Sequence, residues 1–333
     1  MDRNMFGNLE SFIRIVKDAR AMANPTINTE IIDKIRELWN IDEANFAGLE
    51  EALNFQSFNK CKPIGSWTSV EDEFILRFES SLFSDSEIRA FLPENYQSIL
   101  IFLPGSLTGS EEVLRDKKSQ FFLKEFCRIN SIALFVWDWP LQGRRKQAAL
   151  YQNIQSHGIL EREYARLLTM VGTSLWHEYL SELKFCLKEI QKFTDSSREI
   201  TVLGWSQGGW FAYFAPLLGV KISRVISLGS CARFEDLVKT GNTHVHGFFY
   251  YPMNCMRLFD LDHAILKSAL AGTNIYVLAG EKDRGCINDS ICKVETTLIK
   301  NNLQNRFDAQ IIPNTGHSFN NELKQQALKL VIC

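Results

Sequence analysis

The spacing of apolar residues changes after the first fifth of the chain. Before that point, apolar side chains recur three or four positions apart, as Ile31 and Ile35 do, which is typical of amphipathic helices. Pro25 separates two of these helices, because proline interrupts helical hydrogen bonding. The pattern therefore predicts a helical N-terminal extension, residues 1–65, followed by a second unit, residues 66–333.

In the second unit, short apolar runs rich in β-branched residues alternate with stretches of helical period. Strands are predicted at residues 98–103, 132–137, 200–204, 224–228, 274–279 and 309–312, after an alternating strand at 74–78. Helices are predicted at residues 111–129, 160–193, 208–218, 287–301 and from 322 to the end. This order predicts an α/β fold with a mostly parallel, doubly wound sheet that helices cover on both faces.

One segment of the second unit, residues 232–272, fits neither period well. It contains a cluster of aromatic residues, 248–251, with Met253 and Met256 close behind. We therefore expect this segment to lie over the sheet as a small cap or lid.

Composition and charge exclude several classes of protein. The 333 residues include 37 basic and 39 acidic side chains, a formal net charge of −2, which argues against binding to nucleic acid through many phosphate contacts. No window approaches the roughly 18 uninterrupted apolar residues of a membrane-spanning helix. The N-terminus lacks the pattern of a signal peptide, so neither a membrane segment nor secretion is expected.

Cysteine and histidine usage bears on location and on metals. The eight cysteines are scattered without a Cys-x-x-Cys pair, which favours a reduced, cytoplasmic setting. His244 and His246 have a spacing that some metal sites use, but no nearby acid or cysteine pattern completes a ligand set. No dinucleotide-binding or P-loop motif occurs either, so the sequence predicts no metal and no cofactor.

Residues 204–208 read Gly-Trp-Ser-Gln-Gly and lie between a predicted strand and a predicted helix. This is a nucleophile elbow in its expected context. A serine on such a sharp turn needs neighbours without bulk, which Gly204 and Gly208 provide. The elbow also directs the backbone N–H of Gln207 toward the space above Ser206. The alternative is a tight turn with an idle serine.

A serine nucleophile needs a base, and the base needs an acid that orients it. Asp283 and His317 each follow a predicted strand, so with Ser206 they stand in the order Ser, Asp, His at one edge of the sheet. Glu281, two residues from Asp283, is another candidate for the acid.

These residues resemble the α/β-hydrolase fold superfamily over roughly residues 66–333. The resemblance rests on the elbow, on the Gly-Glu-Lys-Asp turn ending at Asp283 and on the Gly-His-Ser-Phe loop around His317. It implies that Ser206 is the nucleophile, Asp283 the acid and His317 the general base. Because some members place the acid after an earlier strand, it also makes Glu235 and Asp236, which follow the strand at 224–228, alternatives for the acid.

The resemblance also implies an oxyanion hole. One N–H would come from Gln207 and the other from the loop after the strand at 98–103, where Ser106 is the expected donor and Leu107 the alternative. In that loop Pro104 and Gly105 stand where many members have His-Gly.

Three polar residues follow the strand at 132–137. In the superfamily an aspartate here commonly supports the active-site edge, which is the role expected for Asp138. Arg144 and Arg145 could bind an anionic substrate group, because guanidinium forks suit carboxylates and phosphates, but paired arginines in a loop are usually only solvated.

Together these observations predict a serine hydrolase that cleaves a carboxylic ester or thioester, either a small molecule or an acyl-carrier-linked substrate. The aromatic cap suggests an apolar acyl group or an aromatic one. The same triad also serves peptidases, carbon–carbon bond hydrolases and acyltransferases, and the fold occurs in binding proteins without catalysis. The sequence leaves the oligomeric state open.

Overall fold

A computed structural model describes residues 49–50, 53, 60–81, 83, 85–106, 109–115, 122–142, 145, 157–170, 173–239, 259–283, 285–318 and 320–332. Most of the expected N-terminal extension lies outside these residues, as does the middle of the expected cap.

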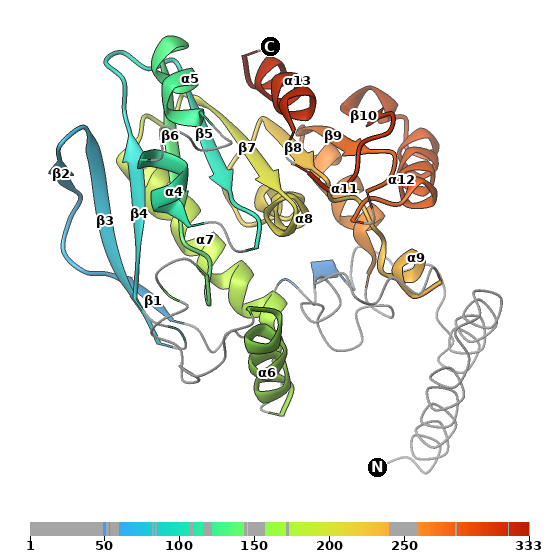
Figure 1. Ribbon diagram of the computed structural model, residues 1–333, viewed down its shortest axis with the longest axis horizontal. Helices are drawn as coiled ribbons and strands as arrows, with labels where there is room; N and C mark the ends of the chain where they lie inside the picture. Colours follow the sequence, from blue (N-terminus) through green and yellow to red (C-terminus); the bar gives the residue numbers. More distant parts are fainter. Residues whose placement is uncertain are drawn as a thin grey trace.

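A ten-stranded sheet forms the centre of the described structure (Figure 1). Its strands are β1 (Cys61–Pro63), β2 (Thr68–Val70), β3 (Glu73–Ser80), β4 (Ser86–Phe91), β5 (Ser98–Leu103), β6 (Ile132–Trp137), β7 (Glu199–Trp205), β8 (Arg224–Leu228), β9 (Asn274–Gly280) and β10 (Phe307–Ile312). The strand order is β1-β3-β4-β6-β5-β7-β8-β9-β10, with β2 paired to β3. From β6 to β10 all neighbours are parallel, whereas β1 to β4 pair antiparallel.

The helices are α4 (Ser110–Arg115), α5 (Leu123–Ile129), α6 (His157–Met170), α7 (Leu175–Phe193), α8 (Gln207–Ala212), α9 (Phe234–Lys239), α11 (Leu261–Leu270), α12 (Asn288–Lys300) and α13 (Asn321–Ile332), with short 3-10 turns η2 (Ala215–Leu217) and η4 (Gln304–Arg306). The α/β class and the mostly parallel sheet are thus confirmed. The stretch predicted as one helix over 160–193 is two helices, because Ser174 caps the start of α7 by accepting the N–H of His177.

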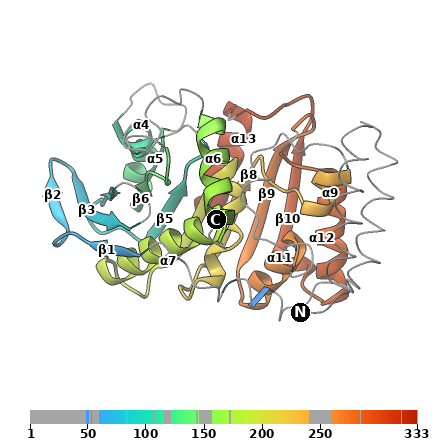
Figure 2. The same cartoon turned by 90° about the horizontal axis from the view of Figure 1, so that it is seen from below.

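Alternate residues of the central strands enter two separate cores, which is why the strands read as continuous apolar runs. Along β5, Ile99, Ile101 and Leu103 join the core covered by α7, α8, α11 and α12. Leu100 and Phe102 join the core covered by α4, α5 and α13. Figure 2 shows these two helix layers on opposite sides of the sheet.

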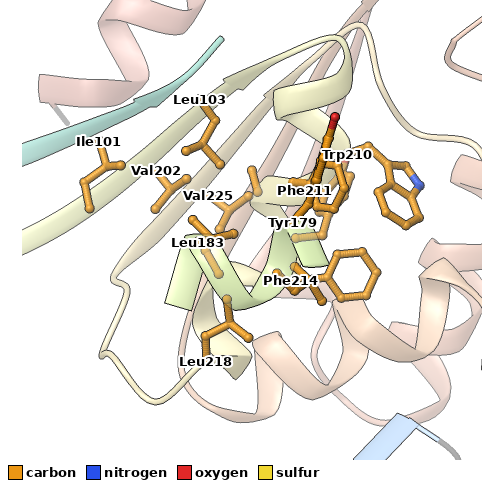
Figure 3. Close-up of a cluster of buried hydrophobic side chains, with 14 of the residues drawn as sticks. Ile101, Leu103, Tyr179, Leu183, Val202, Trp210, Phe211, Phe214, Leu218 and Val225 are labelled. Carbon is orange, nitrogen blue, oxygen red and sulfur yellow. The ribbon is translucent and has the colours of Figure 1, made fainter. Parts of the chain in front are cut away.

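The larger core is rich in aromatic side chains. Figure 3 shows Ile101, Val202 and Val225 of the sheet facing the helical layer that carries Tyr179 and Phe211. The Tyr179 and Phe211 ring centroids are 5.5 Å apart. Burial of each such side chain stabilises the fold by about 1.5–3 kcal/mol, so this layer fixes α8, and with it the turn before α8, firmly on the sheet.

At both boundaries that the sequence suggested, elements from the two sides of the boundary pack together. The strand Cys61–Pro63, which precedes the expected boundary at residue 65, pairs with β3 in the main sheet. At the other boundary, α11 belongs to the helix layer beside α12, with Ala264 and Ile265 in the core, although it lies inside the segment expected as a cap. The cap residues 240–258 fall outside the described part of the chain.

Candidate active site

The turn between β7 and α8 carries Ser206 in a strained conformation, with φ 52° and ψ −117°. Its N–H donates a hydrogen bond of 2.8 Å to the carbonyl oxygen of Leu228. The flanking glycines are sterically required. A Cβ at Gly204 would lie 2.3 Å from the carbonyl oxygen of Gly208, and a Cβ at Gly208 would lie 2.0 Å from that of Leu103. The two glycines around Ser206 therefore permit the sharp turn, which presents the serine at the edge of the sheet.

The structure brings Ser206, His317 and Asp283 together. His317 Nε2 lies 2.9 Å from Ser206 Oγ, and His317 Nδ1 lies 2.9 Å and 3.0 Å from the two carboxylate oxygens of Asp283. The Asp283 side chain is fully buried, and one of its oxygens accepts the N–H of Gly285 at 2.7 Å. This is the spatial order that nucleophile, base and orienting acid require.

Parallel pairing of β9 and β10 places Asp283 and His317 side by side, because each residue follows the carboxyl end of its strand. The two loops are also hydrogen-bonded to each other. Lys282 N–H donates to the carbonyl oxygen of Thr315 at 2.8 Å, and a Cβ at Gly280 would lie 2.2 Å from the same oxygen. Asp283 and His317 are therefore held as one unit.

Trp205, the residue before the serine, has a role that sequence reasoning missed. Its ring stacks on that of His317, with centroids 4.8 Å apart and an interplanar angle of 21°. A Cβ at Gly105 would lie 2.6 Å from the Trp205 ring, and one at Gly229 would lie 3.0 Å from it. The indole thus fills the space between the loop after β5 and the histidine. In the sequence, the available signal for this contact was an aromatic residue at the variable position of the elbow, between Gly204 and Ser206.

The expected oxyanion-hole residues lie on facing elements. Gln207 begins α8, so its N–H belongs to the first turn, whose N–H groups have no acceptor within the helix. Ser106 follows β5 and is partly exposed. A Cβ at Gly208 would lie 2.6 Å from the carbonyl oxygen of Pro104, so the loop of Ser106 packs directly against the elbow. Leu107, the alternative donor, lies outside the described residues.

The other candidate acids have partners away from Ser206. Glu281 accepts the N–H of Asn314 at 2.9 Å. Asp236 accepts the hydroxyl of Ser290 at 2.7 Å, and Glu235 accepts from the Arg233 guanidinium at 3.2 Å. Of the four, Asp283 is the one that the structure places on His317.

The polar residues after β6 take part in the fold. Asp138 is buried, and one of its carboxylate oxygens accepts the N–H of Ser110 at 2.5 Å, which agrees with a supporting role. Arg145 is also buried and forms a bidentate ion pair with Glu182, while donating to the carbonyl oxygen of Asp138. Arg145 is therefore neither solvated nor directed at a substrate anion. Arg144 is not among the described residues.

A second acidic cluster joins the start of α9 to the start of α11. Asp260 accepts three backbone N–H groups, those of Phe234, Glu235 and Leu261. Burial raises the pKa of Asp260 to about 6, although the nearby Arg233 opposes this. Burial also acts on Asp262, but hydrogen bonds and charge from His263 and Arg233 outweigh it and lower the pKa to about 2.

No metal site or membrane helix occurs in the part of the chain that the structure describes. There, no group of three or more His, Cys, Asp or Glu side chains is arranged to hold a metal ion, and no helix is both long and apolar enough to span a bilayer. The described cysteines are all free thiols. His244 and His246 lie outside this part.

Comparison with known proteins found one relative by sequence, and no protein-family model matches the chain. The relative is "Putative hydrolase YtaP" of Bacillus subtilis (strain 168), 26% identical over 182 residues. The match covers 54% of this chain and 56% of the relative, so it spans little more than half the length of either protein.

Solved structures share the architecture at low identity. Glucuronoyl esterase from Solibacter usitatus is 11% identical, with a TM-score of 0.53 over 83% of this chain and 86% of that one. Methylesterase BT1017 is 14% identical, with a TM-score of 0.52 over 85% of this chain and 59% of that one. Because the strand order, the two helix layers and these likenesses agree, the chain has the α/β-hydrolase fold.

Proposed function

We propose that this protein is a serine hydrolase that cleaves a carboxylic ester through an acyl-enzyme on Ser206. The observation that carries the proposal is the chain of contacts from Ser206 Oγ to His317 Nε2 at 2.9 Å and from His317 Nδ1 to the buried carboxylate of Asp283. Serine is a weak nucleophile near neutral pH, and this arrangement supplies the base that it needs.

In the first half of the reaction, His317 accepts the proton of Ser206 while Oγ attacks the ester carbonyl. Asp283 accepts the Nδ1–H of His317 and stabilises the imidazolium that forms. The backbone N–H groups of Gln207 and Ser106 donate to the oxyanion. The tetrahedral intermediate then collapses, the carbon–oxygen bond to the leaving group breaks, and His317 protonates the departing alkoxide.

In the second half, water replaces the alcohol. His317 accepts a proton from the water as its oxygen attacks the acyl carbonyl, and then returns a proton to Ser206 Oγ. The products are the carboxylic acid and free enzyme. Every proton that leaves a reactant passes through His317, and the residues named here require no cofactor.

An ester is the preferred substrate class for one reason: the two structural neighbours described above, with TM-scores of 0.52 and 0.53, are named as esterases. Fold alone does not fix chemistry, so this remains support by analogy. A thioester, small or carried on an acyl carrier, follows the same path with a thiolate leaving group. The cytoplasmic setting stays a prediction from cysteine usage.

Labelling by a fluorophosphonate probe, followed by a substrate panel, tests the proposal. We expect the wild-type protein to be labelled and Ser206→Ala to be unlabelled, with Ser69→Ala on the exposed strand β2 as the matched control. Equal labelling of Ser206→Ala would rule out Ser206 as the nucleophile. Purified protein is then assayed with acyl esters of graded length, a thioester and a peptide. Hydrolysis of the peptide alone would overturn the ester assignment.

A further inference from the structure

Two buried carboxamides meet beside the nucleophile. Gln142, in the loop after β6, is 1% exposed, and Gln207, the residue after Ser206, is 8% exposed. Gln142 Nε2 donates a hydrogen bond to Gln207 Oε1. Among the described residues, the other two side-chain atoms, Gln142 Oε1 and Gln207 Nε2, have no hydrogen-bond partner.

The pair therefore offers one carbonyl oxygen and one NH₂ group that are buried and unused. This result does not depend on which end of each amide is oxygen. If both amides were turned over, the shared bond would form in the opposite sense, and one carbonyl and one NH₂ would again be left. A buried polar group without a partner costs free energy, so such groups in a native protein call for a structural or functional explanation.

The described residues on either side constrain the backbone of Gln142. Leu141 adopts a left-handed conformation with φ 65°, which is unfavourable for a leucine and marks a constrained turn. The N–H of Arg145 donates to the carbonyl oxygen of Gln142 at 2.9 Å, and the indole N–H of Trp139 donates to that of Pro104 at 3.0 Å. These bonds thus fix the main chain of Gln142 in a turn that Trp139 also ties to Pro104, just before Ser106.

The partner that this pair needs must both donate and accept. A carboxylate would face the free carbonyl oxygen, an ammonium group would face the free NH₂, and an apolar group would leave both atoms unsatisfied. A hydroxyl group has both functions that the pair needs: its oxygen can accept from Gln207 Nε2 and its hydrogen can be donated to Gln142 Oε1. Water can do the same, so a substrate hydroxyl would bind by taking the place of a water molecule.

We propose that Gln142 and Gln207 form a subsite for a hydroxyl group of the substrate, so that the enzyme prefers hydroxylated esters to their apolar isosteres. This inference rests on the proposed function, because the subsite adjoins the proposed nucleophile and the N–H of Gln207. The hydroxyl lies on either the acyl or the alcohol part of the ester. Both sources offer the same chemistry to the two amides.

Three pairs of isosteric esters, two on the acyl side and one on the alcohol side, distinguish the sources. On the acyl side, 4-nitrophenyl 3-hydroxybutanoate and 2-hydroxypropanoate are compared with the 3-methylbutanoate and 2-methylpropanoate. On the alcohol side, 2-hydroxyethyl acetate is compared with propyl acetate. We expect the wild-type protein to favour the hydroxylated member in kcat/KM by about tenfold or more on one side, because a site built to hydrogen-bond a hydroxyl rejects the analogue without it.

Variants of Gln142 test whether the preference for hydroxylated esters depends on the pair of Gln142 and Gln207. In Gln142→Leu the ratio of the two kcat/KM values should fall toward one. Gln142→Glu keeps the size of the side chain but leaves only acceptors after pairing with Gln207, so it should lower the ratio even if the leucine variant is unstable. Gln97→Leu, at the opposite edge of the sheet before β5, is the matched control and should keep the wild-type ratio.

Each result bears on a different claim. If the wild-type protein hydrolyses no ester, the proposed function fails. If it hydrolyses esters with ratios near one on both sides, the subsite is overturned and the pair holds only water. A strong preference that survives in both Gln142 variants would also overturn it, because the hydroxyl would then be recognised elsewhere.

Discussion

Asp283 and Asp260 are both buried carboxylates at the ends of structural elements, but their partners differ in exposure. Asp283 accepts from the ring of His317, whose side chain is 41% exposed. Asp260 accepts from three backbone N–H groups and lies 3.7 Å from the guanidinium of Arg233, which is 8% exposed. A buried acid whose partner reaches solvent can act on a substrate through that partner, whereas one with only interior partners ties the chain together.

The largest effect expected from this contrast is on catalysis. Asp283→Asn should lower kcat/KM by about 10⁴-fold, because an amide no longer holds the imidazole in the tautomer that accepts the Ser206 proton. Steady-state kinetics with the best ester of the panel, together with a thermal melt to show that the fold persists, would measure it.

Glu281→Gln is the control for this variant. Its amide oxygen can still accept the N–H of Asn314, so the rate should stay within a few-fold of wild type. The reverse ranking, with the Glu281 variant inactive and the Asp283 variant active, would move the acid to another position.

Asp260 should instead affect stability, in a manner that depends on pH. Its folded-state pKa of about 6 exceeds its ordinary value of 3.8, so the folded protein binds this proton more tightly than the unfolded chain does. The resulting stabilisation is complete below ~pH 4 and declines by about 3 kcal/mol as pH rises through 6. Asp262, with a pKa of about 2, loses its own contribution only at lower pH.

Urea unfolding of wild type and Asp260→Asn at pH 4, 5, 6 and 7 tests this. The asparagine carries no charge, so the wild-type free energy of unfolding should fall relative to that of the variant across the series. Parallel curves would show that the Asp260 carboxyl is not the group whose titration matters in this range.

The next prediction concerns Trp205, whose ring stacks on the partly exposed side chain of His317. Trp205→Ala would remove the ring that supports His317, and a misplaced base can cost about 10²-fold in rate. Trp205→Phe should recover much of the loss, since a smaller ring still stacks. Trp210→Phe, within α8, is the matched aromatic control. Equal kcat values for the alanine and phenylalanine variants would contradict a role for the stacked ring.

The smallest effect concerns the glycine between the acid and the indole. Gly229 has φ 63°, and a Cβ there would lie 2.8 Å from Asp283 Oδ2. Gly229→Ala should therefore lower kcat by about tenfold through a shift of the carboxylate, and it should lower the melting temperature by a few degrees. Gly219→Ala, also at positive φ but with open space around its Cβ position, should affect the melting temperature alone.

The sequence predicted those elements well whose own residues carry the pattern, and it missed elements that depend on partners elsewhere in the chain. The strand at 98–103 was evident because both its faces are buried, and every residue from Ile99 to Leu103 is apolar. Strand β4 was missed because it contains Arg89. This side chain is 2% exposed and forms an ion pair with Glu73 on the neighbouring strand β3. A charge satisfied by a distant partner looks, in sequence, like a surface residue.

The candidate site divides in the same way. The elbow around Ser206 and the strand ends before Asp283 and His317 are local patterns, and the structure brings these three residues together. The contact of Gln142 with Gln207 joins residues 65 positions apart and depends on a leucine with positive φ, which no periodicity reveals. Stacking of Trp205 on His317 likewise exists only once the sheet has formed.

The strand order divides the site into two halves, which protein engineering could exchange separately. Ser206, Asp283 and His317 follow β7, β9 and β10, whereas Ser106 and Gln142 follow β5 and β6, on the other side of β7. The halves meet where Gly208 touches the backbone of Leu103 without room for a methyl group. Libraries that recombine the loops after β5 and β6 from related chains should therefore redirect selectivity while inheriting an intact triad, provided that the glycine at this junction is kept.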